Sequence, residues 1–264
     1  MLPNLLKIGP LTIKTYGVFV ALGFLLSINY LRTQSKKFNI ATETILDLTL
    51  FILISGIIGA RILYVLLNWQ FYKNNLTEIL AIWSGGLVLY GGLLMGTIFV
   101  IIYSKIKKIE LLKLGDLLAP AIFLGISIGR IGCFCAGCCY GKETNLPWGV
   151  VFNNPLSLAP IGIKIHPTQI YESIFCFILF VILHKINLNI LSTIDKSKII
   201  YGRTFFISIL IYSIYRFFIE YIRNDNRGPL ILGLFPSQLI SIIFIIISVP
   251  ILILLQYRRI KLKQ

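Results

Sequence analysis

Long apolar stretches dominate the pattern of this chain. Residues 79–104 and residues 228–257 contain no charged side chain at all, and the same holds for the shorter stretch 15–31. A helix that crosses a membrane needs roughly 17–25 mostly apolar residues, so each stretch predicts a membrane span. The runs are continuous rather than alternating, which excludes a closed β-barrel.

Four more stretches are apolar enough to span a membrane but carry embedded charges. One of them contains Arg61, and another contains Arg216 and Glu220. By the length criterion the chain therefore has about seven spans. We predict an all-α fold, a polytopic membrane helix bundle of about seven transmembrane helices. The four further spans cover about 47–67, 112–132, 167–184 and 203–222.

Composition supports this prediction and excludes other classes of protein. Charged residues make up 13% of the chain and apolar ones 57%, and the mean hydropathy is +0.86. Soluble domains carry about 25% charged residues. A soluble enzyme and a disordered chain are excluded. The net charge of +15 does not indicate nucleic acid, because the basic residues fall in short clusters between the apolar runs.

These clusters predict an orientation. Basic residues near the membrane concentrate on the cytoplasmic side, so we expect the richer side inside, the N-terminus outside and the C-terminus in the cytoplasm. The richer side holds Arg32, Lys36, Lys37, Lys105, Lys107, Lys108, Lys113, Lys185, Lys196, Lys198, Arg203, Arg258, Arg259, Lys261 and Lys263. The other side holds Lys7, Lys14, Lys73, Arg130, Lys142, Lys164, Arg223 and Arg227.

We expect residues 1–264 to form one integral-membrane domain. The longest outer connection is about 132–165, and its three prolines (Pro147, Pro155 and Pro160) favour a folded surface loop over a linker. The sequence has no internal repeat, which argues against a secondary transporter built from paired halves.

Ionisable residues inside spans are costly and mark candidate functional sites. Arg216 and Glu220 are four residues apart and share one helix face near the outer end, and Arg223 continues that face. One interpretation is an ion pair that satisfies itself. The other is an anion clamp in which Glu220 orients Arg216, since arginine binds phosphate bidentately.

Arg130 follows a span at the same outer boundary. It could extend to the lipid headgroups as many arginines do. Two arginines that arrive at the same depth also fit a lipid-phosphate site.

The segment 85–92 is unusually rich in glycine for a span, and Gly92 and Gly96 have the small-xxx-small spacing of close helix packing. The alternative is that Gly86 and its neighbours give a substrate access to Tyr90. A phenol with a pKa near 10 is a poor base unless its pKa is shifted.

The segment 166–172 opens a span on the outer side, with Pro167 suited to a first helical turn. His166 and Glu172 should therefore lie near the membrane surface.

Four cysteines cluster within 133–139. Packing of small side chains explains them most simply. A disulfide fits an oxidising outer side. Cys135 and Cys138 form a C-x-x-C motif, but zinc or iron–sulfur ligation needs four donors and a redox motif usually accompanies a βαβ pattern. Neither context is present, so we expect no metal.

Taken together, these motifs resemble the prolipoprotein diacylglyceryl transferases of bacterial inner membranes. Each motif is modest, but their order and spacing are specific and extend over nearly the whole chain. They are TYG at 15–17, WSGG at 83–86 continuing through Gly92, Asp116, GRIG at 129–132 continuing through Gly141, LPWGVVF at 146–152, HPTQIYE at 166–172 and RFFIE at 216–220.

The resemblance implies an enzyme that moves the diacylglyceryl group of phosphatidylglycerol to the lipobox cysteine of a preprolipoprotein. It implies no cofactor and no nucleic-acid partner. The active site would face outward from the inner membrane. The catalytic residues would be Arg130, Arg216, Glu220 and Tyr90. Substrate would contact Arg130, Tyr16, Gly86, Gly141, His166 and Glu172.

The sequence departs from the family pattern where the thiol-activating base is expected. Tyr90 stands where many members have a histidine, and Cys133, Ala136 and Cys138 replace Asn, Asn and Glu of the best-known members. The base could be Tyr90 or His166, or a depressed pKa of the substrate thiol could suffice. Two other functions stay open: a phosphatidylglycerol-dependent transferase with another acceptor, and a lipid-binding membrane protein that catalyses nothing.

Overall fold

A computed structural model describes residues 2–9, 11–192, 199–225 and 230–261. The chain forms two compact units. The first comprises Met1–Leu31 and Gly115–Gln264, and the second comprises Arg32–Leu114. Among the basic residues used above to orient the chain, Lys196, Lys198, Arg227 and Lys263 lie outside the described residues.

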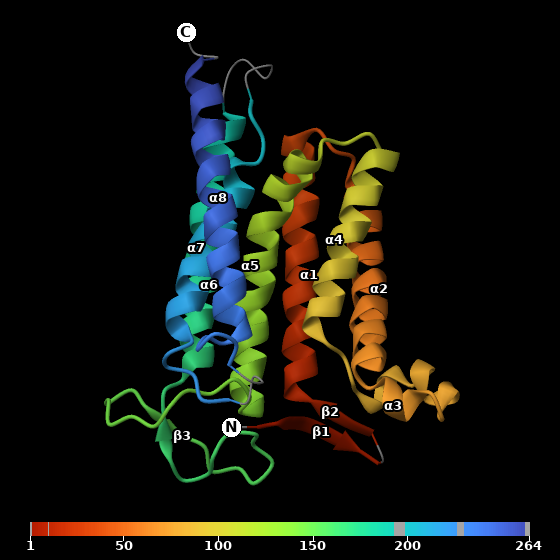
Figure 1. Cartoon of the computed structure of the whole chain (residues 1–264), viewed down its shortest axis with the longest axis vertical. Coiled ribbons are helices and arrows are strands. Elements are labelled where there is room, and N and C mark those ends of the chain that lie inside the picture. The colour runs from red at the N-terminus through yellow and green to blue at the C-terminus, as the bar shows by residue number, and fades with distance from the viewer. Residues whose placement is uncertain (1, 10, 193–198, 226–229, 262–264) are drawn as a thin grey trace. The chain divides into compact units, whose positions relative to one another are not determined.

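Long helices make up most of both units (Figure 1). Among the described residues, six helices are long and apolar enough to cross a membrane. A seventh, α7, has 17 residues and spans about 26 Å at 1.5 Å per residue, close to a hydrocarbon core of about 30 Å. The predicted all-α, multi-pass membrane fold is confirmed. These helices are α1 (Thr15–Ser35), α2 (Thr42–Leu67), α4 (Leu89–Ile106), α5 (Leu111–Ala136), α6 (Thr168–Leu191), α7 (Arg203–Ile219) and α8 (Pro236–Lys261).

The remaining elements are short. An antiparallel pair, β1 (Asn4–Ile8) and β2 (Leu11–Lys14), precedes α1, and the hydropathy pattern did not predict it. The expected folded loop contains the antiparallel pair β3 (Val150–Val151) and β4 (Lys164–Ile165) around a small apolar core. Its first five residues, 132–136, belong to α5 instead. The other short elements are α3 (Trp69–Tyr72) and the 3₁₀ helices Lys36–Phe38, Leu76–Leu80 and Ile82–Ser84.

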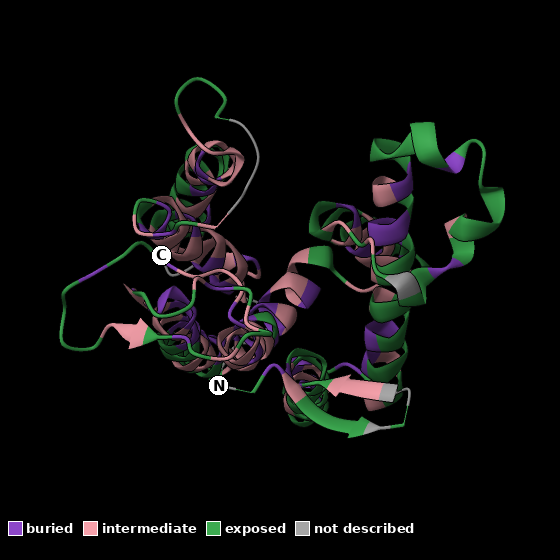
Figure 2. Ribbon diagram, turned by 90° about the horizontal axis from the view of Figure 1, so that it is seen from below, coloured by how far each residue is buried: buried purple, intermediate pink, exposed green. Residues whose placement is uncertain are grey.

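Within each unit, the helices turn buried residues toward one another and exposed residues outward (Figure 2). Many exposed side chains on α1, α2, α4 and α8 are leucine, isoleucine or phenylalanine. Such large apolar surfaces are rare on water-soluble monomers. They fit helices whose outer faces contact lipid.

The predicted span over 79–104 is wrong at its start. The helix begins ten residues later, at Leu89, and 3₁₀ turns precede it. Gly85 and Gly86 have positive φ angles of 90° and 74°, and residues within a right-handed helix have negative φ. The final span likewise begins at Pro236 rather than at residue 228.

The guanidinium of Arg61 on α2 explains the shape of the segment before α4. Arg61 is 5% exposed, and every donor nitrogen bonds a backbone carbonyl of this segment. The bonds go to Ile79 (2.9 Å), Gly85 (2.7 Å), Gly86 (3.2 Å) and Glu78 (2.6 Å). The embedded charge of Arg61 is therefore satisfied by backbone and fastens the segment to α2.

Glycines bring α2 and α4 close together in the second unit. A Cβ on Gly92 would lie 3.0 Å from the carbonyl oxygen of Gly56, and one on Gly91 would overlap Gly59. The glycines therefore allow close helix packing, one of the two interpretations of this segment.

Asp116 on α5 caps the start of α7 in the first unit. Its two carboxylate oxygens accept the backbone N–H groups of Gly202 (2.7 Å) and Phe205 (2.8 Å), and the residue is 1% exposed. A helix begins with unsatisfied N–H groups and a positive dipole end, so a carboxylate there is doubly favourable. The backbone carbonyl of Asp116 also accepts a bond from Asn187 on α6 (2.7 Å).

We expect Asp116→Ala to destabilise the protein by about 2–4 kcal/mol, because two buried N–H groups lose a charged acceptor. The check is thermal unfolding in detergent, with Glu110→Ala as the matched control, since Glu110 is exposed. An Asp116→Ala protein that melts with the wild type would show that the cap contributes nothing.

Candidate active site

A network of charged side chains lies at one end of the first unit, where α5 and α7 end and α6 begins (Figure 1). Its centre is Glu172, one turn into α6 and 2% exposed. Nη2 of Arg130 lies 2.9 Å from both carboxylate oxygens of Glu172, and the Tyr212 hydroxyl donates to Oε1 (2.8 Å). Nη1 of Arg223 is 4.0 Å from Oε2. Three elements and the turn after α7 therefore meet at one carboxylate.

Glu172 is buried, and both of its carboxylate oxygens contact protein donors. Its expected contact with substrate stays a prediction. An isolated buried carboxylate would be strongly disfavoured, so paired donors are required at this position. Glu172 holds Arg130 in place, while the Arg130 side chain keeps 18% of its surface exposed.

Arg216 and Glu220 form the expected ion pair, with Nη1 of Arg216 3.2 Å from Oε2 of Glu220. Nη1 is buried and makes no hydrogen bond of good geometry to any described residue. Both Arg216 and Arg130 interact electrostatically with Tyr212, and Arg216 follows Tyr212 by one turn of α7. The Arg216 side chain keeps 17% of its surface exposed.

Arg223 does not continue the α7 face. The helix ends at Ile219, and Arg223 lies in the following turn, where it bridges to Gly141. Its guanidinium makes a bidentate contact with Asp225, at 3.0 and 2.8 Å. Burial alone would lower the pKa of Arg223, but the bonds to Asp225 outweigh it and raise the pKa above its usual value.

Gly141 allows two backbone segments to cross beneath this network. Its N–H donates to the carbonyl of His166 (3.0 Å). An added Cβ would lie 2.6 Å from Cβ of His166 and 2.9 Å from Cγ2 of Thr168. The position excludes any side chain.

The ring of His166 belongs to a separate network. Its Nδ1 is 3.3 Å from the Tyr171 hydroxyl, which also accepts a bond from Trp148 (2.8 Å). These bonds do not involve Arg130 or Glu172. The contact of His166 with substrate stays a prediction.

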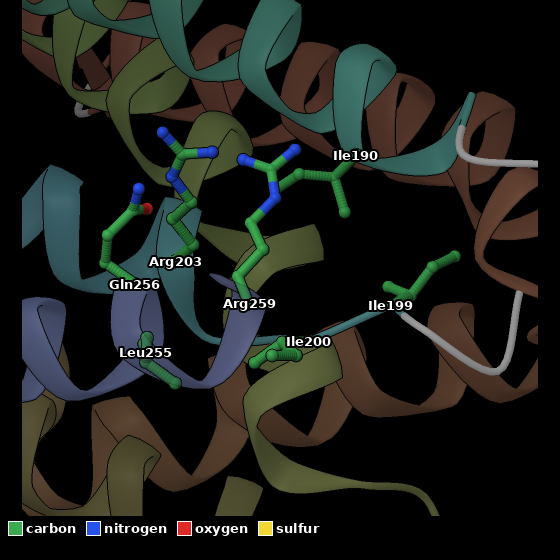
Figure 3. A pocket seen from close by; sticks show the side chains of 7 residues that line it. All are labelled: Ile190, Ile199, Ile200, Arg203, Leu255, Gln256 and Arg259. Carbon is green, nitrogen blue, oxygen red and sulfur yellow. The ribbon is translucent and has the colours of Figure 1, made fainter. Parts of the chain in front are cut away.

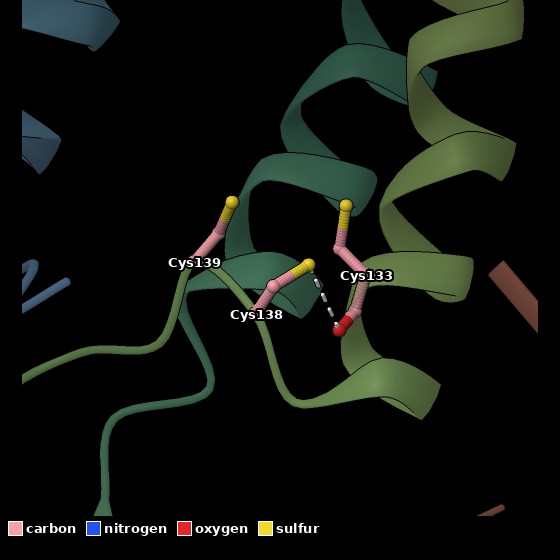
Figure 4. Close-up of side chains that lie close together, drawn as sticks. All are labelled: Cys133, Cys138 and Cys139. Carbon is pink, nitrogen blue, oxygen red and sulfur yellow. Dashed lines mark hydrogen bonds between the residues drawn. The ribbon is translucent and has the colours of Figure 1, made fainter. Parts of the chain in front are cut away.

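Three of the clustered cysteines converge beside Arg130 (Figure 4). The Sγ atoms of Cys133, Cys138 and Cys139 all lie within 4.8 Å of one another, and Nη1 of Arg130 is 3.9 Å from Sγ of Cys133. All five cysteines are free thiols in this structure.

The three thiols differ in acidity. Thiol hydrogen bonds from Cys133 and Cys138, helped by the charges of Arg130 and Arg223, lower the pKa of Cys139. Hydrogen bonds to the neighbouring thiols raise the pKa of Cys138.

Tyr16 is the second residue of α1 and 45% exposed. It interacts electrostatically with Arg130 and with all three converging cysteines. Gly132 permits this approach of α1 to α5, because a Cβ there would lie 2.9 Å from Cβ of Phe19. Tyr16 therefore belongs to the neighbourhood of Arg130.

Gly86 and Tyr90 belong to the second unit. The carbonyl of Gly86 accepts a bond from Arg61, and Tyr90 stands at the start of α4 with 48% of its surface exposed. Their roles stay predictions.

The sequence profile described as Prolipoprotein diacylglyceryl transferase matches residues 3–254. The chain belongs to the prolipoprotein diacylglyceryl transferase family. It is 39% identical to a Clostridium tetani protein named phosphatidylglycerol–prolipoprotein diacylglyceryl transferase, over 98% of this chain and 100% of that protein. Proteins of the same name from Finegoldia magna (37%; 90% and 89% covered) and Trichormus variabilis (35%; 86% and 82% covered) are also similar.

Sequence reasoning missed several residues of this family member's candidate site. Tyr212 precedes Arg216 by four residues, so helix periodicity could have placed it on the same face. Asp225 and Trp148 left no such signal, because a turn and a loop contact bring them to their partners.

A separate cavity lies at the opposite end of α7 (Figure 3). Its lining includes two arginines but no thiol or carboxylate, so it lacks the groups on which the candidate site depends. The lining residues are Arg203, Arg259 and Gln256 together with Ile190, Ile199, Ile200 and Leu255.

We expect Gly141→Ala to destabilise the protein by about 1–3 kcal/mol, the usual range for forcing extra atoms into a packed region. The backbone segments of Gly141 and His166 would have to move apart to make room for the added methyl group. Thermal unfolding in detergent measures the effect.

The control is Gly129→Ala on α5, where an added Cβ meets nothing within 4 Å. There alanine should be neutral or stabilise the helix by up to about 1 kcal/mol. Equal melting of the two variants would contradict the close approach at Gly141.

Proposed function

We propose that this chain transfers the diacylglyceryl group of phosphatidylglycerol to the thiol of the lipobox cysteine of a preprolipoprotein. The products are a thioether-linked lipid and glycerol phosphate. Family membership supports this activity, as do the names of the relatives. The observation that carries it in this chain is Arg130, fixed by the buried carboxylate of Glu172 and still partly exposed, with Arg216 one turn of α7 beyond Tyr212.

The reaction requires charge stabilisation at the leaving group. A sulfur–carbon bond forms at the glycerol carbon while the carbon–oxygen bond to phosphate breaks, and the electron pair leaves with glycerol phosphate. Preorganised donors stabilise such developing charge better than water does. Arg130 and Arg216 would hold the phosphate, because planar guanidinium groups match phosphate oxygens.

The neighbouring residues would position this pair of arginines. Glu172 would orient Arg130, Glu220 would orient Arg216, and Tyr212 would keep the two at a fixed separation. Tyr16 would support the headgroup from α1, and Gly141 and His166 would shape the loop beside it. Gly86 and Tyr90 stay in the proposed site on the resemblance alone.

We further propose that residues 1–264 act as one domain in the bacterial inner membrane, with the N-terminus outside and the C-terminus in the cytoplasm. The distribution of basic residues supports this orientation. The end of the first unit that carries Arg130 and Glu220 would then face outward, toward membrane lipids and the signal peptides of translocated preprolipoproteins.

We expect Arg130→Ala and Arg216→Ala each to lower the transfer rate by at least about 100-fold, the usual effect of losing one donor to a developing charge. Purified protein is incubated with phosphatidylglycerol and a lipobox peptide. Mass spectrometry then follows the diacylglyceryl adduct on the peptide cysteine.

Arg203→Ala is the matched control, because Arg203 lies at the other end of the same helix as Arg216. It should keep wild-type turnover. Full activity in Arg130→Ala or Arg216→Ala would refute the phosphate clamp. Bound phosphatidylglycerol without any adduct in the wild type would refute the proposed acceptor.

A further inference from the structure

The proposed phosphate clamp, formed by Arg130 and Arg216, does not account for activation of the acceptor thiol. It consists of arginines and the carboxylates and tyrosines that hold them, and none of these is assigned to activate the acceptor thiol. The three converging thiols of Cys133, Cys138 and Cys139, here called the thiol cluster, lie beside the clamp and take no part in it. Their geometry suggests what they do.

The sulfur positions fit a small thiophilic cation. Zinc binds thiolate at about 2.3 Å, so sulfurs of a tetrahedral site lie about 3.8 Å apart. The three Sγ atoms are already within 4.8 Å of one another, with Cys133 at the end of α5 and Cys138 and Cys139 on the segment that follows (Figure 4). Side-chain shifts of about 1 Å or less would complete the geometry.

The backbone that carries the thiol cluster is fixed by α6. Gln169 donates to the carbonyl of Cys138 and Thr168 to that of Cys139, both at 2.6 Å. The N–H of Cys138 donates to the carbonyl of Cys133 (3.2 Å). These bonds hold the loop, and the Cys138 thiol itself donates to the carbonyl of Cys133 (3.7 Å), a bond that metal binding would replace.

The local charge also fits a metal bound by thiolates. Three thiolates and one Zn²⁺ carry a net charge of −1. Nη1 of Arg130 lies 3.9 Å from Sγ of Cys133, and both Arg130 and Arg223 interact with Cys139. The nearby cations would compensate the negative charge of the complex.

Three ligands leave one coordination position open. Among the described residues, no further histidine, cysteine, aspartate or glutamate joins the thiol cluster, and Cys138 and Cys139 are only partly buried. Catalytic zinc sites have three protein ligands and an open fourth position, whereas structural sites are closed. An external ligand can reach this site.

We propose that Cys133, Cys138 and Cys139 bind Zn²⁺ and that the open position takes the thiolate of the acceptor cysteine. The second part rests on the proposed transferase function. On binding, the acceptor thiol gives its proton to water. Its sulfur then attacks the glycerol carbon, the carbon–oxygen bond to phosphate breaks, and the electron pair leaves with glycerol phosphate. The thioether product is a weak neutral ligand and is replaced by water, while zinc remains Zn²⁺.

Metal binding is tested first, without reference to activity. Full-length protein in detergent is reduced, stripped with a chelator and titrated with Co²⁺, whose thiolate charge-transfer absorption reports sulfur ligation. Elemental analysis gives the zinc content. We expect one metal ion per chain in the wild type, and binding at least tenfold weaker in Cys138→Ser and in Cys139→Ser.

The matched controls are Cys135→Ser and Cys176→Ser, because these cysteines lie outside the thiol cluster. Both should bind metal as the wild type does. Thermal unfolding shows whether each variant is folded. Because two cluster variants are made, the test still stands if one of them does not fold. Unchanged metal affinity in folded cluster variants, or a disulfide among the three cysteines in active protein, would overturn the site.

Activity separates this proposal from the proposed function. We expect metal-free protein to lose at least 90% of adduct formation and added Zn²⁺ to restore it. Arg130→Ala should still bind zinc but form no adduct. Full adduct formation by metal-free protein would overturn the role of zinc and leave the transferase intact. No adduct from zinc-loaded wild type would instead overturn the proposed transfer reaction.

Discussion

The candidate site depends on one buried carboxylate. Glu172 is 2% exposed, and a charge so placed is stable only when donors surround it. Arg130 from α5, Tyr212 from α7 and Arg223 from the following turn converge on its two oxygens. The same contacts fix the ends of three elements and the orientation of Arg130. Removing this carboxylate would leave Arg130 without an orienting partner and loosen the junction of all three.

Charges within the spans serve two different purposes, and the count of free donors distinguishes them. Every donor nitrogen of Arg61 bonds a carbonyl of the segment before α4, and both oxygens of Asp116 cap α7. Four of the five N–H groups of Arg61 and both oxygens of Asp116 are thus engaged in holding the fold. Arg216 has an ion-pair partner but keeps a buried Nη1 without a good hydrogen bond to the described residues. An intramembrane charge is therefore a candidate for binding when its local partners leave donors unused.

Hydropathy predicted most spans because a helix in contact with lipid needs about 20 consecutive, mostly apolar residues. It failed before α4, where an apolar segment leaves the helix because its carbonyls bond Arg61, a partner distant in sequence. Spacing found the Arg216–Glu220 pair because four residues make one helical turn. The burial of Glu172 could not be found this way, because its donors come from other elements. Local periodicity reveals partners on one helix, whereas a junction of several helices becomes visible only in the structure.

The cysteines show how an expectation about metal can depend on an assumed ligand number. No metal was expected from the sequence, on the premise that zinc ligation needs four protein donors, but an open site needs only three. Cys133 follows Arg130 by three residues on α5, so the two share a helix face, and their side chains approach to 3.9 Å. An acceptor thiol bound at the cluster and a phosphate held by Arg130 would then lie close together, because their protein ligands are one helical turn apart. Nucleophile and leaving group must meet at a single carbon, and this spacing supplies the proximity that such a displacement requires.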